Sequence, residues 1–265
     1  MVLFGLLVGM MKDKENVTVI MATHNNAKTI ERALRSVTRG IRPANQVIIG
    51  DNDSTDGTYD VLCKLLGAEH VTIDEKTGMP PQFGGELDGT PVKIFRKRLS
   101  TIGDTLNIAM QMKWQGVTVF GFMDPTSWYA PDKIAQAIRV FGTHQSIACV
   151  VSDCDDHHPD GRVERIFRDS FDMQRLLKGF PYDGNFLIRP HVFPKLKGGF
   201  NPQMPIRHDY DLLLRVSEIG LIYHIPAPLH HNVVCAVDSA TQQTIAQCEM
   251  TAKQLASQRR SATNG

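Results

Sequence analysis

Short apolar segments alternate with segments of helical periodicity through the first half of the chain. Residues 17–22 and 47–49 are mostly β-forming and show no polar–apolar alternation, as expected of strands buried on both faces. Apolar residues then recur at helical spacing, at positions 30, 33, 34 and 37 and again at 61, 62, 65 and 66. This β-α-β-α order predicts an α/β fold with a mostly parallel sheet and helices on both of its faces.

The alternation continues to residue 151 and is less regular beyond it. Residues 74–91 interrupt it with glycine, proline and charged residues, and we interpret them as a surface excursion, for which a hairpin is one possible form. The other predicted elements are strands at 92–95, 117–122, 147–151, 185–188 and 221–225, and helices at 102–115, 131–141, 208–218 and from about 238.

The composition is that of an ordinary globular protein. Its 265 residues suit one large domain or two small ones. The contents of 42% hydrophobic and 22% charged residues are usual for such domains. The 29 basic residues nearly balance the 28 acidic ones, so the charge predicts no nucleic-acid partner.

The cysteines and the N-terminus indicate the compartment. Five scattered cysteines without a CxxC pair indicate a reducing environment and argue against a disulfide framework or a zinc knuckle. The N-terminal apolar stretch of about ten residues is too short to span a bilayer, and it lacks the basic region and cleavage site of a signal peptide. We therefore expect a cytoplasmic protein without a transmembrane segment, with peripheral membrane contact left open.

Polar residues follow three of the predicted strands. The loop from Thr23 to Asn26 follows the first strand, Asp51 ends the second, and Asp124 follows the strand at 117–122. Ligands of open α/β sheets bind beyond the C-terminal ends of the strands, so these residues are expected to converge on one crevice. The carboxylates suit a ribose, a base edge or a metal ion, although each alone is equally typical of a turn or an N-cap.

The stretch after Asp124 bears on metal binding. Hard divalent ions usually take several oxygen ligands, but Asp124 is followed by Pro125, Thr126 and Ser127 and not by a second acid. A hydroxyl is a neutral ligand, so Thr126 does not replace a carboxylate in charge. An ion at Asp124 would therefore depend on phosphate oxygens of a bound substrate.

Four segments, taken in order, resemble the inverting glycosyltransferases of family 2, which have the GT-A fold. The resemblance covers residues 17 to about 231. The segments are VTVIMATHNNAKTIERALRSV, VIIGDNDSTDGT, FGFMDPTSWYAPDKI and FLIRPHVFPKLKGGFNPQMPIRHDYDLLLRVSEIG. They depart from the family pattern at Ala22, His24, Asn52, Asp53, Thr126 and His208.

This resemblance implies a nucleoside-diphosphate sugar donor, with a UDP-sugar expected, bound by the N-terminal half. Thr23 and Asn25 would line the nucleotide pocket, and Asp51 would contact the base or the ribose. Asn107 fits a family helix that lies near the diphosphate, and Asp124 matches the first acid of the family's DxD motif.

The resemblance also assigns the catalytic base to Asp209, which follows His208 where the family has Glu-Asp. Inverting transfer needs a base to take the proton of the acceptor hydroxyl, and an N-cap role for Asp209 is the alternative. Thr126 stands in the place of the second DxD acid. The expected Mn²⁺ or Mg²⁺ ion would therefore be held by Asp124, with His231 as a further ligand.

Positive charge near the departing diphosphate is the remaining requirement of this reaction. Lys97 and Arg98 precede the helix at 102–115 and would lie over the phosphates, with solvated surface as the alternative. The acidic stretch at 153–161 is interpreted as an exposed loop and not as a metal site.

We divide the chain into an N-terminal extension (1–16), a glycosyltransferase domain (17–235) and a C-terminal helix or tail (236–265). Within the domain, residues 17–127 would bind the nucleotide sugar and residues 128–235 the acceptor. The acceptor stays open among a glycan, a lipid carrier, a protein and a modified nucleobase.

Two other functions compete with an active inverting hexosyltransferase. A lapsed module that binds nucleotide or glycan without transfer is favoured by Thr126 and His208, whereas Asp51, Asp124 and Asp209 argue against it. A nucleotidyltransferase ranks lower, because such enzymes carry a glycine-rich phosphate loop after the first strand. The corresponding stretch here, ATHNNAKT, contains no glycine.

Overall fold

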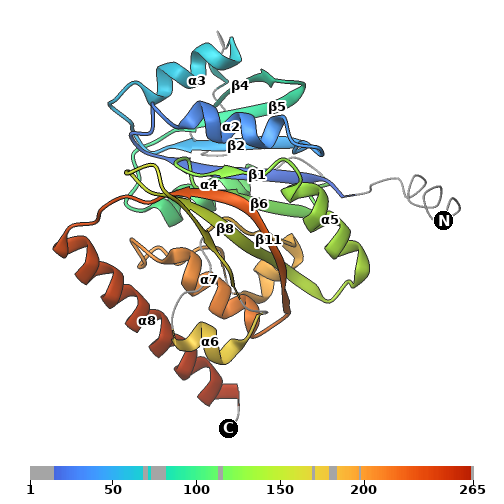
Figure 1. The fold of residues 1–265 in the computed structure, drawn as a ribbon, viewed down its shortest axis with the longest axis vertical. Coiled ribbons are helices and arrows are strands. Elements are labelled where there is room, and N and C mark those ends of the chain that lie inside the picture. The colour runs from blue at the N-terminus through green and yellow to red at the C-terminus, as the bar shows by residue number, and fades with distance from the viewer. Residues whose placement is uncertain are drawn as a thin grey trace, which may run out of the picture.

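A single mixed sheet runs through the computed structural model and carries helices on both faces (Figure 1). The structure describes residues 15–67, 71–72, 82–112, 116–168, 171–178, 184–196 and 198–263. The strands are β1 (Val17–Thr23), β2 (Gln46–Asp51), β3 (Val71–Thr72), β4 (Gln82–Leu87), β5 (Thr90–Arg96), β6 (Val119–Met123), β7 (Trp128–Tyr129), β8 (Ile147–His157), β9 (Val163–Ile166), β10 (Leu187–Ile188) and β11 (Leu221–Val233). The helices are α2 (Ile30–Thr38), α3 (Thr58–Leu66), α4 (Ile102–Gln111), α5 (Lys133–Thr143), α6 (Met173–Lys178), the 3-10 helix η1 (Pro190–Leu196), α7 (His208–Ser217) and α8 (Ser239–Thr263).

The central strands of the sheet are parallel. Within the described ranges the sheet has eleven strands in the order β3-β4-β5-β2-β1-β6-β10-β8-β11-β7, with β9 paired to β8. The neighbours from β5 to β6 are parallel, as are β8 and β11. The short β10 joins the two groups through antiparallel pairing. The expected mostly parallel α/β sheet is therefore confirmed.

The burial of β1 explains why its sequence does not alternate, because every residue of this strand is buried. Val19 and Met21 pack in one core with Leu34 of α2. Ile20 packs on the opposite face, in a second core with Leu106 of α4. The sheet thus has an apolar layer on each face.

A capping box closes the N-terminus of helix α4. Thr101 Oγ1 accepts from the amide of Asp104 at 3.0 Å, and Asp104 Oδ2 accepts from the amide of Thr101 at 3.1 Å. These bonds satisfy amide groups that a helix start leaves without intrahelical partners. Gly50 of β2 lets the helix lie close to the sheet, because a Cβ there would overlap the methyl group of Thr105.

A hairpin forms the described part of the expected surface excursion. β4 and β5 pair antiparallel and are joined by Asp88 and Gly89, whose φ angles of 51° and 81° suit a tight hairpin turn. The carboxylate of Asp88 accepts from Thr38 of α2 at 2.8 Å and pairs with Arg39 at 2.9 Å. Residues 74–81 of the excursion lie outside the described residues.

The acidic stretch at 153–161 differs from the expected exposed loop. Residues 153–157 are the end of β8, where Asp153 and Asp155 are buried. Asp155 pairs with Arg165 of β9 at 2.9 Å, and Asp153 Oδ1 lies 2.8 Å from His224 Nε2 of β11. The interpretation as an exposed loop is wrong for residues 153–157, because they belong to β8. Partners on both neighbouring strands compensate for the burial of the two carboxylates.

The C-terminal helix α8 packs against α7. Ion pairs join α8 to the residues at the two ends of α7. Arg207 pairs with Glu249 at 3.0 Å and Arg259 with Glu218 at 2.9 Å.

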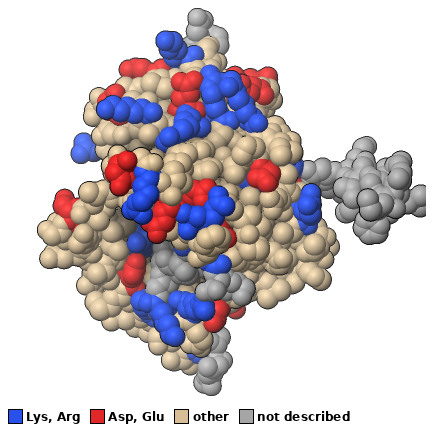
Figure 2. All heavy atoms as spheres, in the orientation of Figure 1, with Lys and Arg blue, Asp and Glu red and all other residues tan. Residues whose placement is uncertain are grey.

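Basic and acidic side chains lie interspersed on the face of the molecule drawn in Figure 2. Among the described residues, none of the helices has the length and apolar character needed to cross a membrane.

Candidate active site

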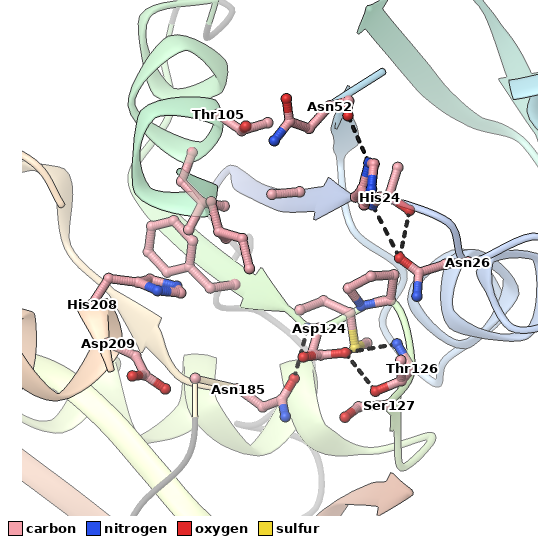
Figure 3. A pocket seen from close by; sticks show the side chains of 18 of the residues that line it. His24, Asn26, Asn52, Thr105, Asp124, Thr126, Ser127, Asn185, His208 and Asp209 are labelled. Atoms are coloured by element: carbon pink, nitrogen blue, oxygen red, sulfur yellow. Dashed lines mark hydrogen bonds between the residues drawn. The ribbon is translucent and has the colours of Figure 1, made fainter. Parts of the chain in front are cut away.

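A cleft of about 450 Å³ opens beyond the C-terminal ends of β1 and β6 (Figure 3). Figure 3 shows His24 and Asn26 on one side of Asp124, and His208 and Asp209 on the other. Three residues predicted for the site, Thr23, Asp124 and Asp209, line this cleft. Other lining residues include Asn52, Thr105, Phe122, Asn185, Phe200 and Asn232.

The loop after β1 is held by its own side chains. Asn26 Oδ1 accepts from the hydroxyl of Thr23 at 2.9 Å and from the amide of His24 at 3.1 Å. His24 Nδ1 lies 2.8 Å from the carbonyl oxygen of Asn52. Because a carbonyl only accepts, this nitrogen carries a proton. The imidazole is thereby fixed at the cleft wall next to Asn52.

Asn25 has a local structural contact and is not among the residues that line the cleft. It has a positive φ of 57°, which asparagine tolerates better than most residues. Its side-chain oxygen accepts from the amide of Thr55 at 2.9 Å. Asn25 therefore ties the first loop to the loop that follows β2.

Asp51 lies behind the cleft lining, fully buried at the end of β2. Its Oδ1 accepts from the amide of Ser54 at 3.3 Å and from the Ser54 hydroxyl. Its Oδ2 is buried without a hydrogen-bond partner among the described residues, and Arg96 Nε lies 3.5 Å away. Burial raises the pKa of the Asp51 carboxyl, while the bonds from Ser54 and the nearby Arg96 act in the opposite direction.

Asp124 is exposed at the end of β6 and is oriented from both sides. Its amide donates to Asn185 Oδ1 at 3.1 Å. Its Oδ1 accepts from the amide of Thr126 at 2.7 Å and from the Thr126 hydroxyl at 2.6 Å. Thr126 thus closes a turn onto the carboxylate and adds no second negative charge.

His231 is not among the residues that line the cleft beside Asp124. His231 stacks on Trp128, with ring centroids 4.9 Å apart, and its Nδ1 lies 3.2 Å from His157 Nε2. Burial lowers the pKa of His231. The next residue, Asn232, lines the cleft, and successive side chains of a strand point to opposite faces.

The described part of the chain holds no cluster of three or more His, Cys, Asp or Glu residues suited to a metal ion. The donor set therefore does not fit a preformed metal site. It fits an ion that binds through Asp124 together with oxygens of a bound diphosphate.

Asp209 lies in the first turn of α7, and the N-cap of that helix is Arg207, with a φ of 62°. The carboxylate accepts from the amide of Tyr210 at 2.9 Å. Gly184 faces it closely, because a Cβ at this position would lie 3.1 Å from Asp209 Oδ2. His208 packs edge-on against Phe200, with ring centroids 5.4 Å apart.

Asn107 makes two hydrogen bonds to the backbone of Phe200 and does not line the main cleft. Its side chain donates to the carbonyl oxygen of Phe200 and accepts from the amide of the same residue, both at 2.8 Å. It lines a separate hollow of about 360 Å³ next to α8. Asn107 therefore fixes the loop whose Phe200 contacts His208.

Lys97 and Arg98, the two basic residues expected near the diphosphate, do not line the cleft that contains Asp124. Arg98 lines a second hollow of about 390 Å³, which shares His24 and Asn52 with the main cleft. Lys97 is exposed and lines neither of these two hollows. The preceding residue, Arg96, which the sequence did not single out, is the one that approaches Asp51.

Comparison with known proteins identifies the family. Residues 18–197 match the family described as "Glycosyl transferase family 2", and the chain belongs to this family. Among curated proteins it is similar to chondroitin synthase of Pasteurella multocida (strain Pm70) and to hyaluronan synthase of Pasteurella multocida. Each is 23% identical over 225 residues, which cover 82% of this chain and 20% of the relative. The chain thus spans about a fifth of the length of these relatives.

Solved structures of glycosyltransferases share the fold, which is the GT-A fold. The structure of S. aureus TarS 1-349 with UDP-GlcNAc has a TM-score of 0.65 and 14% identity, covering 85% of this chain and 60% of that one. The mannosyltransferase PcManGT from Pyrobaculum calidifontis, with GDP-Man and Mn²⁺, has a TM-score of 0.62 and 18% identity, covering 92% and 64%. Glucosyl-3-phosphoglycerate synthase from Mycobacterium tuberculosis, with Mn²⁺, UDP and glucosyl-3-phosphoglycerate, has a TM-score of 0.59 and 13% identity, covering 90% of this chain and 80% of that one.

Proposed function

We propose that this chain transfers a sugar from a nucleoside diphosphate sugar, with UDP as the nucleotide, to a hydroxyl group of an acceptor, with inversion at the anomeric carbon. The observation that carries the proposal is the shared cleft of Thr23, Asp124 and Asp209. It joins a strand end suited to a nucleotide, a carboxylate suited to a diphosphate-bound ion, and a carboxylate suited to a base. Family membership and neighbours that contain UDP or UDP-GlcNAc support the same function.

The reaction is a single displacement. The acceptor oxygen forms a bond to the anomeric carbon while the bond to the diphosphate breaks, and the diphosphate leaves with the electron pair. Asp209 takes the proton of the acceptor hydroxyl. The lack of a side chain at Gly184 leaves room beside this carboxylate, because a Cβ there would lie 3.1 Å from its Oδ2.

Donor recognition is assigned to the loops after β1 and β2. His24 and Asn52 line both the main cleft and the adjoining hollow, so a nucleoside can extend from one to the other. Asp51 would complete the contact through Oδ2, which is buried without a hydrogen-bond partner among the described residues. Arg98 in the adjoining hollow supplies positive charge to the donor side.

A divalent cation, Mn²⁺ or Mg²⁺, is proposed to bind with the nucleotide and not before it. Asp124 is the residue that would hold this cation. The positive charge of the cation would stabilise the departing diphosphate. Neighbours that contain Mn²⁺ or Mg²⁺ support the use of such an ion in the family.

A lapsed module that binds nucleotide without transfer is the second candidate. Thr126, whose amide and hydroxyl both donate to Asp124 Oδ1, is the observation that favours it. An ion at this oxygen has to compete with both donors.

Incubation with a panel of nucleotide sugars separates the two functions. An active enzyme releases the free nucleoside diphosphate from one donor of the panel, with a rate that rises when an acceptor is present. A lapsed module binds a nucleotide in calorimetry but releases none from any donor.

A further inference from the structure

A buried lysine lies between α5, β8 and β11, behind the wall of the cleft. Lys133 is the first residue of α5 and is 2% exposed. Its ammonium nitrogen lies 2.7 Å from the carbonyl oxygen of Asn185, 3.0 Å from His230 Nδ1 and 3.3 Å from Ser152 Oγ. It also lies 4.7 Å from the centroid of the Tyr129 ring.

Two physical costs oppose a lysine at this place. Burying an ammonium ion is unfavourable unless hydrogen bonds replace its hydration. A cation in the first turn of a helix is also repelled by the positive end of the helix dipole. Lys133 offsets both costs through acceptors on β8, on β11 and just before β10. One side chain thereby joins three segments of the chain to α5.

Asn185 carries this contact to the cleft. Its side-chain oxygen accepts from the amide of Asp124 at 3.1 Å, and its side-chain nitrogen donates to Asn232 Oδ1 at 3.2 Å. Asn232 Oδ1 also accepts from the hydroxyl of Ser127 at 3.1 Å. All four of these residues line the cleft, so the ammonium of Lys133 is one hydrogen bond away from the cleft wall.

We propose that Lys133 is a positioning residue that holds Asn185, and through Asn185 the main chain at Asp124, in the geometry that the transfer reaction requires. Lys133 acts through Asn185 and does not touch the substrate. Hydrogen-bonded networks of this kind lose their rigidity when one member is removed. The kinetic part of this inference rests on the proposed function, whereas the structural part does not.

Site-resolved amide hydrogen exchange tests the structural part. Lys133→Met keeps the apolar stem and removes the donor, and it should accelerate exchange at the Asp124 amide roughly tenfold or more. The amide of Asn52, which donates to Thr23 O at 2.8 Å between the segments that follow β2 and end β1, should keep its rate. Unchanged exchange at Asp124 overturns the proposal. Equal acceleration at both amides also overturns it, because it indicates general destabilisation.

Turnover tests the kinetic part. Lys133→Met should lower kcat about tenfold or more, because small displacements of positioned groups are costly. Affinity for the nucleoside monophosphate should stay within about twofold, because the loops after β1 and β2 are unchanged. The exposed Lys64→Met in α3 is the matched control and should behave as wild type. A kcat of Lys133→Met within about twofold of wild type overturns the proposal.

A double-mutant cycle shows whether Lys133 acts through Asp124. In an Asp124→Asn background, Lys133→Met should change kcat by no more than about twofold. Full additivity overturns the proposed route.

The structural test also covers two further outcomes. Where Lys133→Met does not fold, Lys133→Leu, a second apolar side chain without a donor for the Asn185 carbonyl, should give the same local exchange effect. An unchanged Asp124 rate in Lys133→Leu overturns the proposal. A wild-type protein without any transfer would contradict the proposed function, and the exchange at Asp124 would then decide the structural part alone.

Discussion

Thr126 donates two hydrogen bonds to one carboxylate oxygen of Asp124, from its amide at 2.7 Å and from its hydroxyl at 2.6 Å. The residue in the place of a second acid is therefore a partner of the first acid. A divalent ion at Asp124 either displaces these donors from Oδ1 or binds through Oδ2. Both arrangements leave the ion with one protein carboxylate, so its affinity depends on the diphosphate.

Replacing Thr126 by an acid should strengthen metal binding. Thr126→Asp adds a carboxylate while keeping the backbone amide that donates to Asp124, and it should tighten nucleotide-dependent Mn²⁺ binding by about tenfold or more. Thr126→Val, which removes the hydroxyl without adding charge, is the control. Titration of Mn²⁺ in the presence of UDP measures the effect, and equal affinity in wild type and Thr126→Asp would contradict this view of the site.

Removal of the metal should lower activity reversibly. With one protein carboxylate and the diphosphate as ligands, the ion should leave when chelator is added, and transfer should return on addition of Mn²⁺ or Mg²⁺. The measurement is transfer rate in excess chelator and after addition of each ion. Full activity in excess chelator would contradict the metal proposal and leave Arg98 and helix amides to stabilise the diphosphate.

Asp51→Asn should stabilise the protein at neutral pH. Burial raises the pKa of the Asp51 carboxyl above its ordinary value of 3.8, so the folded protein holds this proton more tightly than the unfolded chain. Ionisation therefore costs stability above the raised pKa, and this cost disappears as the pH falls below 3.8. Thermal melts should show a higher Tm for Asp51→Asn at pH 7, with a gap that closes as the pH is lowered through this window. A gap independent of pH would contradict the assignment.

The same substitution should weaken nucleotide binding. The amide cannot make the charge-assisted bond that we assign to Asp51 Oδ2, and its loss should reduce affinity about tenfold or more. Calorimetry with UDP measures this change. Unchanged affinity would place Asp51 in a structural role, in which it closes the loop through Ser54.

The predictable part of the fold is the part with long apolar patterns. β1, β2 and β6 are buried on both faces and therefore carry continuous apolar runs. β7 and β10 have two residues each, too few to show any period. The end of β8 was missed because its acids are buried beside Arg165 and His224, which local sequence does not reveal.

The same limit applies to the site. Thr23 and Asp124 are recognisable because a strand end places them next to an apolar run, whereas Asp209 is recognisable through the resemblance of its segment to family 2. Lys133 contacts Asn185, which is 52 positions away in the sequence, and His230, which is 97 positions away. No local pattern therefore distinguishes it from an exposed helical lysine. The turn that ties Thr126 to Asp124 is local, yet a threonine there is equally compatible with a free hydroxyl.

Asp209 is the residue on which the proposed chemistry depends most directly. Asp209→Asn keeps the size of the side chain and its ability to accept from the amide of Tyr210, but it cannot take a proton from the acceptor. The decisive measurement is the rate of sugar transfer by Asp209→Asn and by wild type, alongside calorimetric affinity for the nucleotide. We predict a rate lowered by about 10²–10⁴-fold with unchanged nucleotide affinity. Transfer by Asp209→Asn at a near-normal rate would contradict the account.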